Sequence, residues 1–336
     1  MKEAKKITKI FLVITALLLI FAALGCAPTG RPVEIKVHEG TEGLKMEFLE
    51  KSPPDEVYVG EKFPLTVELS NKGAFDIKNG VFALGIERDY IWAPSEYIDN
   101  PIKFDLMGRS AYDPIGGFDR KTIELTAKNL DPQSETHTTT VALTACYPYR
   151  TEATAQVCID TDIYGRRLEE KVCTTETLSM GTIEREGQEL PRGQGAPIAI
   201  TKIEQKMMPH NESDELITPT FMIYVRNMEN GLPVDINVYD RACLATGISK
   251  QAWNVVSAKV YLSDRSVQLD CTPKLDPKSS DKTGHIKLEK QEDFIRCSLN
   301  EGIPKTLGTF TTPLMVDMDY GYTFTISKNV MIRRQV

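Results

Sequence analysis

The chain has 336 residues, which is long enough for about two domains that each bury a core. Hydrophobic residues make up 41% and charged residues 26%, as in globular proteins, and the formal net charge is −7. An acidic surface repels phosphate backbones, so the composition argues against nucleic acid as a partner.

Residues 1–26 are predicted to be an export signal or an anchor. Four lysines within the first nine residues precede an apolar run, residues 10–24, which ends at Gly25 and Cys26. A basic start, an apolar stretch and a small residue before the break form the pattern of a secretory signal. Fifteen helical residues rise roughly 22 Å, less than the roughly 30 Å hydrocarbon core of a bilayer. Loss of residues 1–25 removes four lysines and one glutamate and gives a mature net charge of −10.

Residues 23–26 leave open which kind of anchor the chain has. Residues 23–26 resemble the lipobox of lipoproteins, which implies lipidation at Cys26. A lipobox normally has leucine three positions before the cysteine and a small residue two before, whereas this chain has Ala23 and Leu24. The alternative is an uncleaved anchor helix. In both cases the N-terminus holds the protein in the membrane, and the rest lies on the outer face of the cell membrane.

The other cysteines predict disulfides. An even number of cysteines in an exported chain is typical of a disulfide framework, and no pair has the C-x-x-C spacing of zinc or redox sites. The six candidates are Cys146, Cys158, Cys173, Cys243, Cys271 and Cys297. The favoured pairing joins Cys146 to Cys158 across a hairpin around residues 150–154, Cys271 to Cys297, and Cys173 to Cys243. The main rival joins Cys158 to Cys173 and leaves Cys146 and Cys243 to pair or to remain reduced.

A first β-domain is predicted at residues 43–160, after a tether at residues 27–42. Apolar residues alternate with polar ones in several short runs that are separated by Gly, Pro, Asn and Asp, which is the period of half-buried strands. Strands at this spacing suggest a sandwich. The runs are residues 63–69, 81–86, 123–127 and 141–145.

A linker at residues 161–196 and a second β-domain at residues 197–336 are predicted next. The linker ends in a Pro- and Gly-rich stretch, residues 187–195, and the best helical candidate in the second domain is short, residues 248–255. The strand-like runs of this part are residues 198–203, 221–225, 255–262, 267–269, 286–288 and 314–318.

The two halves of the chain resemble each other at an offset of 173 residues. Residues 140–149 align with residues 313–322 without a gap, including a Tyr-x-Tyr pair in each, and residues 157–159 align with residues 330–332. Earlier in each half, Asn71 before Gly73 corresponds loosely to Asn227 before Gly231. We therefore expect two copies of one fold, each closing in a Tyr-x-Tyr hairpin whose rings serve packing rather than binding.

The Asn-x-Gly turn at residues 71–73 and the closing Tyr-x-Tyr pattern resemble CARDB-like immunoglobulin-fold modules of cell-surface proteins. The layout, with residues 194–197 opening the second module, looks like predicted archaeal surface lipoproteins. The resemblance covers roughly residues 43–336. It implies an all-β fold of two immunoglobulin-like β-sandwich domains and a surface location, and it carries over no catalytic residue.

Residues for catalysis or metal binding are not grouped in the sequence. Four histidines are scattered without a second ligand nearby, and no nucleophile motif is present, so we expect no enzyme, no metal and no cofactor. Asp317 and Asp319 are expected on a solvated strand face. A calcium site that joins Asp160 and Asp162 to Asp113 and Asp119 lacks any supporting spacing. Asn211 begins a weak glycosylation sequon.

These features favour a membrane-anchored structural or adhesive surface protein, with other surface proteins or glycans as candidate partners. One alternative is a filament subunit assembled by strand donation, since residues 32–37 alternate as a donated strand would. Another is a substrate-binding lipoprotein of a transporter, although the chain lacks the strand–helix alternation of such lobes.

Overall fold

The computed structural model describes residues 37–98, 100–168, 170–185, 188–244 and 247–335. It is mostly β-sheet, with 53% strand and 6% helix, so the all-β prediction is confirmed, whereas the immunoglobulin-like assignment stays a prediction. No helix in these ranges is long and apolar enough to cross a bilayer. The predicted signal or anchor with Cys26, the tether up to residue 36 and most of the strand at residues 32–37 lie outside the described residues.

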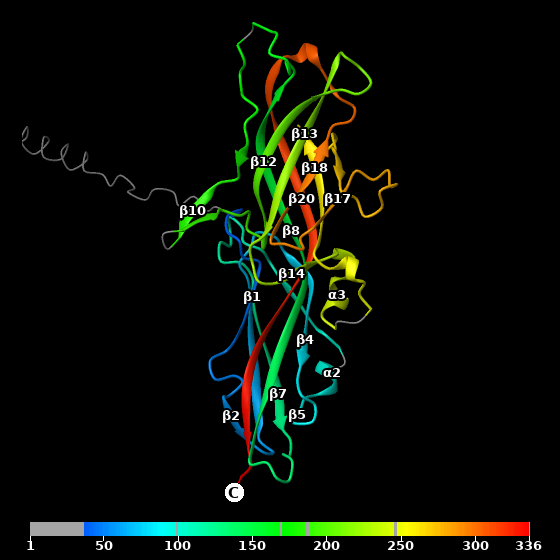
Figure 1. Cartoon of the computed structure of the whole chain (residues 1–336). Helices are drawn as coiled ribbons and strands as arrows, with labels where there is room; N and C mark the ends of the chain where they lie inside the picture. The colour runs from blue at the N-terminus through cyan, green and yellow to red at the C-terminus, as the bar shows by residue number, and fades with distance from the viewer. Residues whose placement is uncertain (1–36, 99, 169, 186–187, 245–246, 336) are drawn as a thin grey trace, which may run out of the picture. The chain divides into compact units, whose positions relative to one another are not determined.

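The strands and short helices follow the chain in the order shown in Figure 1. In the first half they are β1 (Leu44–Phe48), β2 (Glu56–Tyr58), β3 (Lys62–Asn71), β4 (Ile77–Gly85), β5 (Ile91–Trp92), α2 (Ser95–Ile98), β6 (Ile102–Leu106), β7 (Phe118–Ala127) and β8 (Thr136–Asp160). Between the halves are β9 (Leu178–Ser179), β10 (Thr182–Arg185) and β11 (Gln188–Pro191).

The second half adds a similar set. Its elements are β12 (Ile198–Pro209), β13 (Leu216–Asn227), β14 (Leu232–Val234), η1 (Ile236–Val238), α3 (Tyr239–Ala242), η2 (Lys250–Ala252), β15 (Val255–Leu262), β16 (Asp270–Thr272), β17 (Gly284–Lys287), β18 (Glu292–Ser298), β19 (Ile303–Pro304), η3 (Lys305–Leu307) and β20 (Thr309–Arg333).

Two long strands form the centre of the fold. β8 and β20 each have 25 residues and pair antiparallel over their whole length, from Thr136 opposite Arg333 to Asp160 opposite Thr309. We call this pair the ribbon. It runs through an eight-stranded sheet with the order β17-β15-β20-β8-β4-β6, while β14 and β2 pair with β20 off this path.

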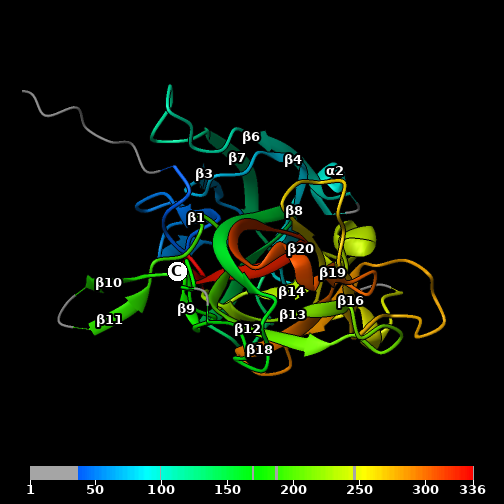
Figure 2. The ribbon, with the colours of Figure 1, turned by 90° about the horizontal axis from the view of Figure 1, so that it is seen from above.

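Two smaller sheets cover the two ends of the ribbon (Figure 1), and the view from above shows β8 and β20 near the centre with the other strands around them (Figure 2). The sheet β1-β3-β7-β5 lies at one end, together with residues 136–148 and 321–333 of the ribbon, and we call this part lobe 1. The sheet β16-β18-β13-β12-β9 lies at the other end, together with residues 149–160 and 309–320, and we call this part lobe 2. The predicted domain bounds, 43–160 and 197–336, follow chain order, whereas the ribbon joins residues from both ranges in each lobe.

One face of the ribbon is apolar from end to end. In β8 the odd-numbered side chains are the buried ones, among them Val141, Leu143 and Ile159, and in β20 the even-numbered ones are, among them Leu314 and Ile332. The register pairs odd residues of β8 with even residues of β20, so both sets lie on one face. A single apolar core therefore continues through both lobes.

The ribbon explains the internal repeat. The offset of 173 residues carries Pro148 onto Gly321, and these two residues are paired at the middle of the ribbon. The strand order is palindromic about this point, because β4 pairs with residues 142–146 of β8 and β15 pairs with residues 314–319 of β20. Each repeat thus sends the second half of its last strand into the other lobe.

The predicted closing hairpins are wrong. Both Tyr-x-Tyr pairs lie in the middle of an unbroken strand. Within residues 150–154 the polar side chains at even positions project from the less buried face, and neither Gly, Pro nor Asn breaks the strand there. In addition, residues 267–269 lie outside the named strands, and residues 248–255 hold only the short η2 and the first residue of β15.

Three disulfides join the six predicted cysteines. Cys146 bonds to Cys243, Cys158 to Cys173 and Cys271 to Cys297, with Cα–Cα distances of 5.6, 5.8 and 4.0 Å. The predicted Cys271–Cys297 pair is confirmed. The pairs Cys146–Cys158 and Cys173–Cys243 are wrong, because Cys146 and Cys158 stand on one extended strand, about 40 Å apart at 3.3 Å per residue.

We predict that the Cys146–Cys243 disulfide stabilises the fold more than Cys158–Cys173 does. The first closes a loop of 97 residues and the second one of 15. In the loop-entropy account these correspond to about 4.7 and about 3 kcal/mol. Urea unfolding of the paired variants Cys146→Ala/Cys243→Ala and Cys158→Ala/Cys173→Ala should show the larger loss of free energy in the former. Equal losses, or the reverse order, would contradict this ranking.

Candidate functional site

Four tyrosines fill the middle of the ribbon, where the lobes meet. Tyr147 and Tyr149 lie two residues apart on β8, and the register places Tyr322 and Tyr320 opposite them on β20. All four are at most 1% exposed, and neighbouring ring centroids lie 5.6–6.4 Å apart in edge-on or tilted arrangements. We call this group the tyrosine cluster.

Two asparagines accept hydrogen bonds from the hydroxyls of Tyr149 and Tyr322. Tyr149 donates to Asn71 Oδ1 at 3.1 Å, and Tyr322 donates to Asn227 Oδ1 at 2.9 Å. Each asparagine also closes its own loop, since its Nδ2 donates to the carbonyl four residues later, at 2.7 Å from Asn71 and 2.8 Å from Asn227. The two Asn loops that the sequence comparison aligned therefore hold equivalent tyrosines.

The hydroxyls of Tyr147 and Tyr320 connect the ribbon to the starts of β1 and β12, the first directly and the second through Thr151. Tyr147 Oη accepts from the Leu44 backbone N–H at 3.2 Å, at the beginning of β1. Tyr320 Oη lies 2.9 Å from Thr151 Oγ1, which donates to the Ile198 carbonyl at the beginning of β12. Burial raises the pKa of all four tyrosines well above the usual value of a phenol, so they remain neutral hydrogen-bonding groups.

The predicted linker ends inside this junction. Residues 193–198 are buried, and the Gly195 carbonyl accepts from the Ala74 N–H at 2.7 Å while the Gly195 N–H donates to Gly40 at 2.7 Å. The side chain of Gln194 binds both backbone groups of Ile200. Gly193 and Gly195 have φ angles of +68° and +72°, which favour glycine. This end of the linker is therefore a fixed part of the core.

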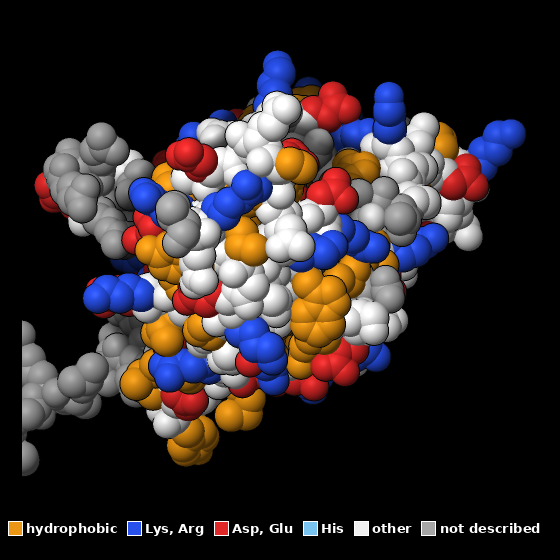
Figure 3. Space-filling view, turned by 90° about the horizontal axis from the view of Figure 1, so that it is seen from below, with side chains coloured by type: hydrophobic (Ala, Val, Ile, Leu, Met, Phe, Trp, Pro, Cys, Tyr) orange, Lys and Arg blue, Asp and Glu red, His pale blue; other side chains and the backbone are white. Residues whose placement is uncertain are grey.

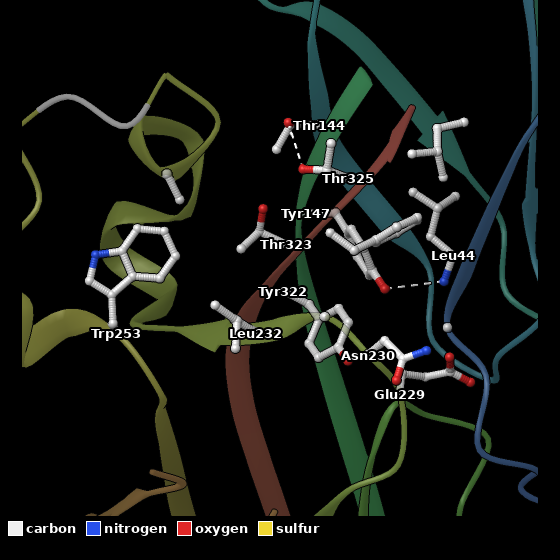
Figure 4. A pocket seen from close by; sticks show the side chains of 15 residues that line it. Leu44, Thr144, Tyr147, Glu229, Asn230, Leu232, Trp253, Tyr322, Thr323 and Thr325 are labelled. Atoms are coloured by element: carbon white, nitrogen blue, oxygen red, sulfur yellow. Dashed lines mark hydrogen bonds between the residues drawn. The ribbon is translucent and has the colours of Figure 1, made fainter. Parts of the chain in front are cut away.

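A groove of about 550 Å³ opens beside the tyrosine cluster in Figure 4, and we call it the central groove. Leu232, Trp253, Phe324 and Ile326 are among its larger apolar lining residues, and Tyr147 and Tyr322 of the tyrosine cluster also line it. The remaining lining residues are Gly43, Leu44, Thr144, Glu229, Asn230, Gly231, Ala242, Thr323 and Thr325. A concave, largely apolar surface with a few polar groups is the usual form of a binding site.

Glu229 is the charged residue of the central groove. It is partly buried, and neither a hydrogen bond nor an ion pair joins its carboxylate to any other described residue. Burial, and then the nearby carboxylate of Glu42, raise the pKa of Glu229. Thr144 and Thr325, by contrast, are bonded to each other at 2.8 Å. The groove therefore offers an unpaired acidic group next to apolar side chains.

The other predicted residues lie elsewhere. Asn211 is exposed in the loop between β12 and β13. Within the described ranges no cluster of His, Cys, Asp or Glu could hold a metal ion. Asp319 bonds to Arg150 at 2.6 Å, and Asp317 is only 5% exposed and bonds to Arg265, so the prediction of a solvated face was wrong for Asp317.

The central groove was not predicted, because its residues come from distant parts of the chain. Residues 43–44, 229–232, 253 and 322–326 meet there only once the ribbon has formed. The repeat was the one signal that pointed toward it, since the aligned Asn and Tyr positions surround the junction. The tyrosine rings are buried and hydrogen-bonded, and two of them also reach the groove wall.

We predict that the hydroxyls of Tyr149 and Tyr322, one from each repeat, contribute equally to the free energy of unfolding. Tyr149→Phe and Tyr322→Phe should each lower the free energy of unfolding by about 1 kcal/mol, because each leaves an asparagine oxygen without one donor.

Gly73→Ala should lower the free energy of unfolding by about 3 kcal/mol or more, since its Cβ would stand 1.9 Å from Tyr149 Oη. Gly85→Ala is the matched control, with its nearest contact at 3.5 Å, and should be close to neutral in denaturant unfolding. Similar losses for the two glycine variants would contradict the packing described for Gly73.

No protein-family model and no curated protein matches the chain. Among solved structures, it is similar to the secreted serine protease VesC from Vibrio cholerae, at 9% identity and a TM-score of 0.17, over 83% of this chain and 50% of that one. It is also similar to a DUF4466 family protein from Parabacteroides merdae, at 11% identity and a TM-score of 0.16, over 83% of this chain and 99% of that one. The chain thus spans half the length of VesC.

Proposed function

We propose that this chain is a membrane-anchored, extracytoplasmic structural or adhesive surface protein without catalytic activity. The observation that carries the proposal is the ribbon, which fastens two lobes into one unit. The anchor in this proposal is a lipid on Cys26 or an uncleaved N-terminal helix.

The ribbon favours display over ligand closure. Substrate-binding lipoproteins close two lobes around a ligand by bending at a hinge. Here a hinge between the lobes would have to bend two hydrogen-bonded strands and open the tyrosine cluster, all of whose members are buried. The buried segment at residues 193–198 would have to move as well. The junction therefore supports a rigid spacer more than a closing clamp.

The disulfides support a location outside the cytoplasm. Three disulfides fit an oxidising environment, because cytosolic thiols are kept reduced. At the lobe 1 end, acidic and basic side chains are interspersed among hydrophobic patches (Figure 3). Such a mixed surface suits contacts with other surface proteins or glycans better than binding to a polyanion.

We also propose that the lobes are CARDB-like immunoglobulin modules of an archaeal surface protein. Each lobe has two β-sheet layers around a common apolar core, as sandwiches have, and apart from β2 with β20 their strands pair antiparallel. In each repeat, a buried tyrosine hydroxyl of the ribbon also binds an asparagine at a loop of the same repeat.

A rigid spacer should show one fixed distance between the lobes. We suggest spin labels on unnatural amino acids at Glu124 on β7 and Lys206 on β12, both exposed, so that the disulfides stay intact. Electron–electron double resonance on the purified full chain should give a single narrow distribution, as narrow as that of the pair Glu124 and Lys103 within lobe 1. Two distances, or a distribution much broader than the control pair, would favour a hinged binding protein.

Surface location is tested on intact cells that express the full chain. A membrane-impermeant amine reagent should label the lysines of the mature part as fully before lysis as after it. The chain should stay with the membrane after an alkaline wash. If the anchor is a lipid, Cys26→Ser should block processing and change the gel mobility, and an unchanged mobility would identify the uncleaved helix. Labelling only after lysis would refute the proposed location.

A further inference from the structure

β20 has an unpaired edge beside the central groove. One side of β20 is paired with β8 throughout. On the other side, β14 pairs with residues 321–323 and β2 with residues 331–333. Among the described strands none pairs on this side with residues 324–330, which we call the β20 edge.

The backbone groups of the β20 edge face outward at odd positions. The Met331 N–H donates to the Asp55 carbonyl at 2.9 Å, and the Arg333 carbonyl accepts from the Val59 N–H at 2.8 Å. Both contacts lie on the side away from β8, and the direction alternates from one residue to the next along a strand.

Three residues therefore present free backbone groups at this edge. Thr325, Ser327 and Asn329 direct both N–H and C=O away from β8, and no backbone hydrogen bond on that side links them to another described residue. Their side chains are exposed. Seven residues at about 3.3 Å each give an edge of about 23 Å, which is long enough to template another strand.

The usual obstacles to strand addition are weak at this edge. Natural sheets block their edges with proline, bulges or free charges. The β20 edge contains neither proline nor bulge, and its one lysine, Lys328, is tied to Asp55 at 2.9 Å and to the Pro53 carbonyl at 2.7 Å. The equivalent edge of β8 in lobe 2 differs, because it carries the charged Glu152 and the small Ala153 where β20 has Thr325 and Ile326.

The groove and the edge form one surface. Phe324, Thr325 and Ile326 belong to both. An added strand would place alternate side chains next to Phe324 and Ile326, and one of its ends would reach the unpaired carboxylate of Glu229. A basic residue at that end would neutralise a partly buried charge that no described residue pairs.

We infer that the β20 edge and the central groove bind an extended peptide segment of another protein, with alternating apolar residues and a basic residue near its C-terminal end. The orientation follows from the antiparallel ladder, which is the slightly more stable one and brings the end of the added strand to Phe324. This inference names a partner class for the proposed adhesive role. The binding itself does not depend on where the protein lies in the cell.

The test uses the full chain in detergent and a labelled synthetic peptide of alternating valine and threonine with arginine as its last residue. Fluorescence anisotropy should show saturable binding. Ser327→Pro should weaken it by about tenfold or more, because proline removes an outward N–H and its ring occupies the edge. Ser327→Ala is the matched control, since it keeps the N–H, and should bind as the unchanged chain does.

Two further measurements do not depend on how Ser327→Pro folds. Two peptides are compared, one N-methylated at its odd positions and one at its even positions. One should lose binding and the other should keep it, because only one of these two sets of N–H groups faces β20. Glu229→Gln should weaken the arginine peptide by about tenfold and leave a glutamine-ended peptide unchanged. Moving the arginine to the N-terminal end should weaken binding to the unchanged chain.

Several outcomes would overturn the inference. These are the absence of saturable binding at about 1 mM peptide, and equal effects of Ser327→Ala and Ser327→Pro in folded protein. A third is a dimer of the chain alone, in sedimentation, that Ser327→Pro dissociates, since the occupant would then be a second copy. Peptide binding together with labelling only after lysis would refute the surface location and leave the strand site standing.

Discussion

A ribbon that is apolar on one face over 25 residues has to be covered along its whole length. One small sheet cannot do this, since most strands have 3–10 residues, so two separate sheets cover the two ends. Where the two covers meet, the middle of the ribbon faces loops whose backbone groups need partners. Side chains at this point have to be large enough to fill the gap and polar enough to bind those loops. Tyrosine meets both needs. Tyr147 binds the start of β1, and Tyr149 and Tyr322 bind loops. Tyr320 binds Thr151, which in turn binds the start of β12.

The pseudo-two-fold relation is close at the centre and weak at the periphery. The ribbon, its flanking strands and the Asn–Tyr contacts recur in the same spatial arrangement in both halves. The outer parts differ: β12 has 12 residues where β1 has five, and the Cys158–Cys173 disulfide belongs to lobe 2 alone. The central groove is also specific to one side, where Phe324 and Ile326 stand in place of Thr151 and Ala153. The shared core therefore constrains the architecture, while the edges are free to specialise.

Local patterns predicted the strands well and their connections poorly. Alternation located β3, β7 and β15, because burial on one face imposes a period of two residues on any strand. The same alternation cannot tell a long strand from two short ones, and residues 150–154 were polar enough to suggest a turn. The same error led to the wrong disulfide between Cys146 and Cys158, since a hairpin would have brought them together and a continuous strand separates them. The Tyr and Asn positions were found as a repeat, but their contacts and the central groove depend on strands that cross between lobes, which no local pattern encodes.

The crossing strands couple the two halves of the chain during folding. Lobe 1 needs residues 321–333 to flank β8, and these residues are the last part of the ribbon to be synthesised. Until they arrive, residues 136–148 keep one open strand edge and an incomplete core, which is the state most prone to wrong pairing. The Cys146–Cys243 disulfide joins β8 to the residue after α3, and both cysteines precede β20 in the chain. Because each lobe contains part of β8 and part of β20, neither lobe has its full core until these two strands have paired along their whole length.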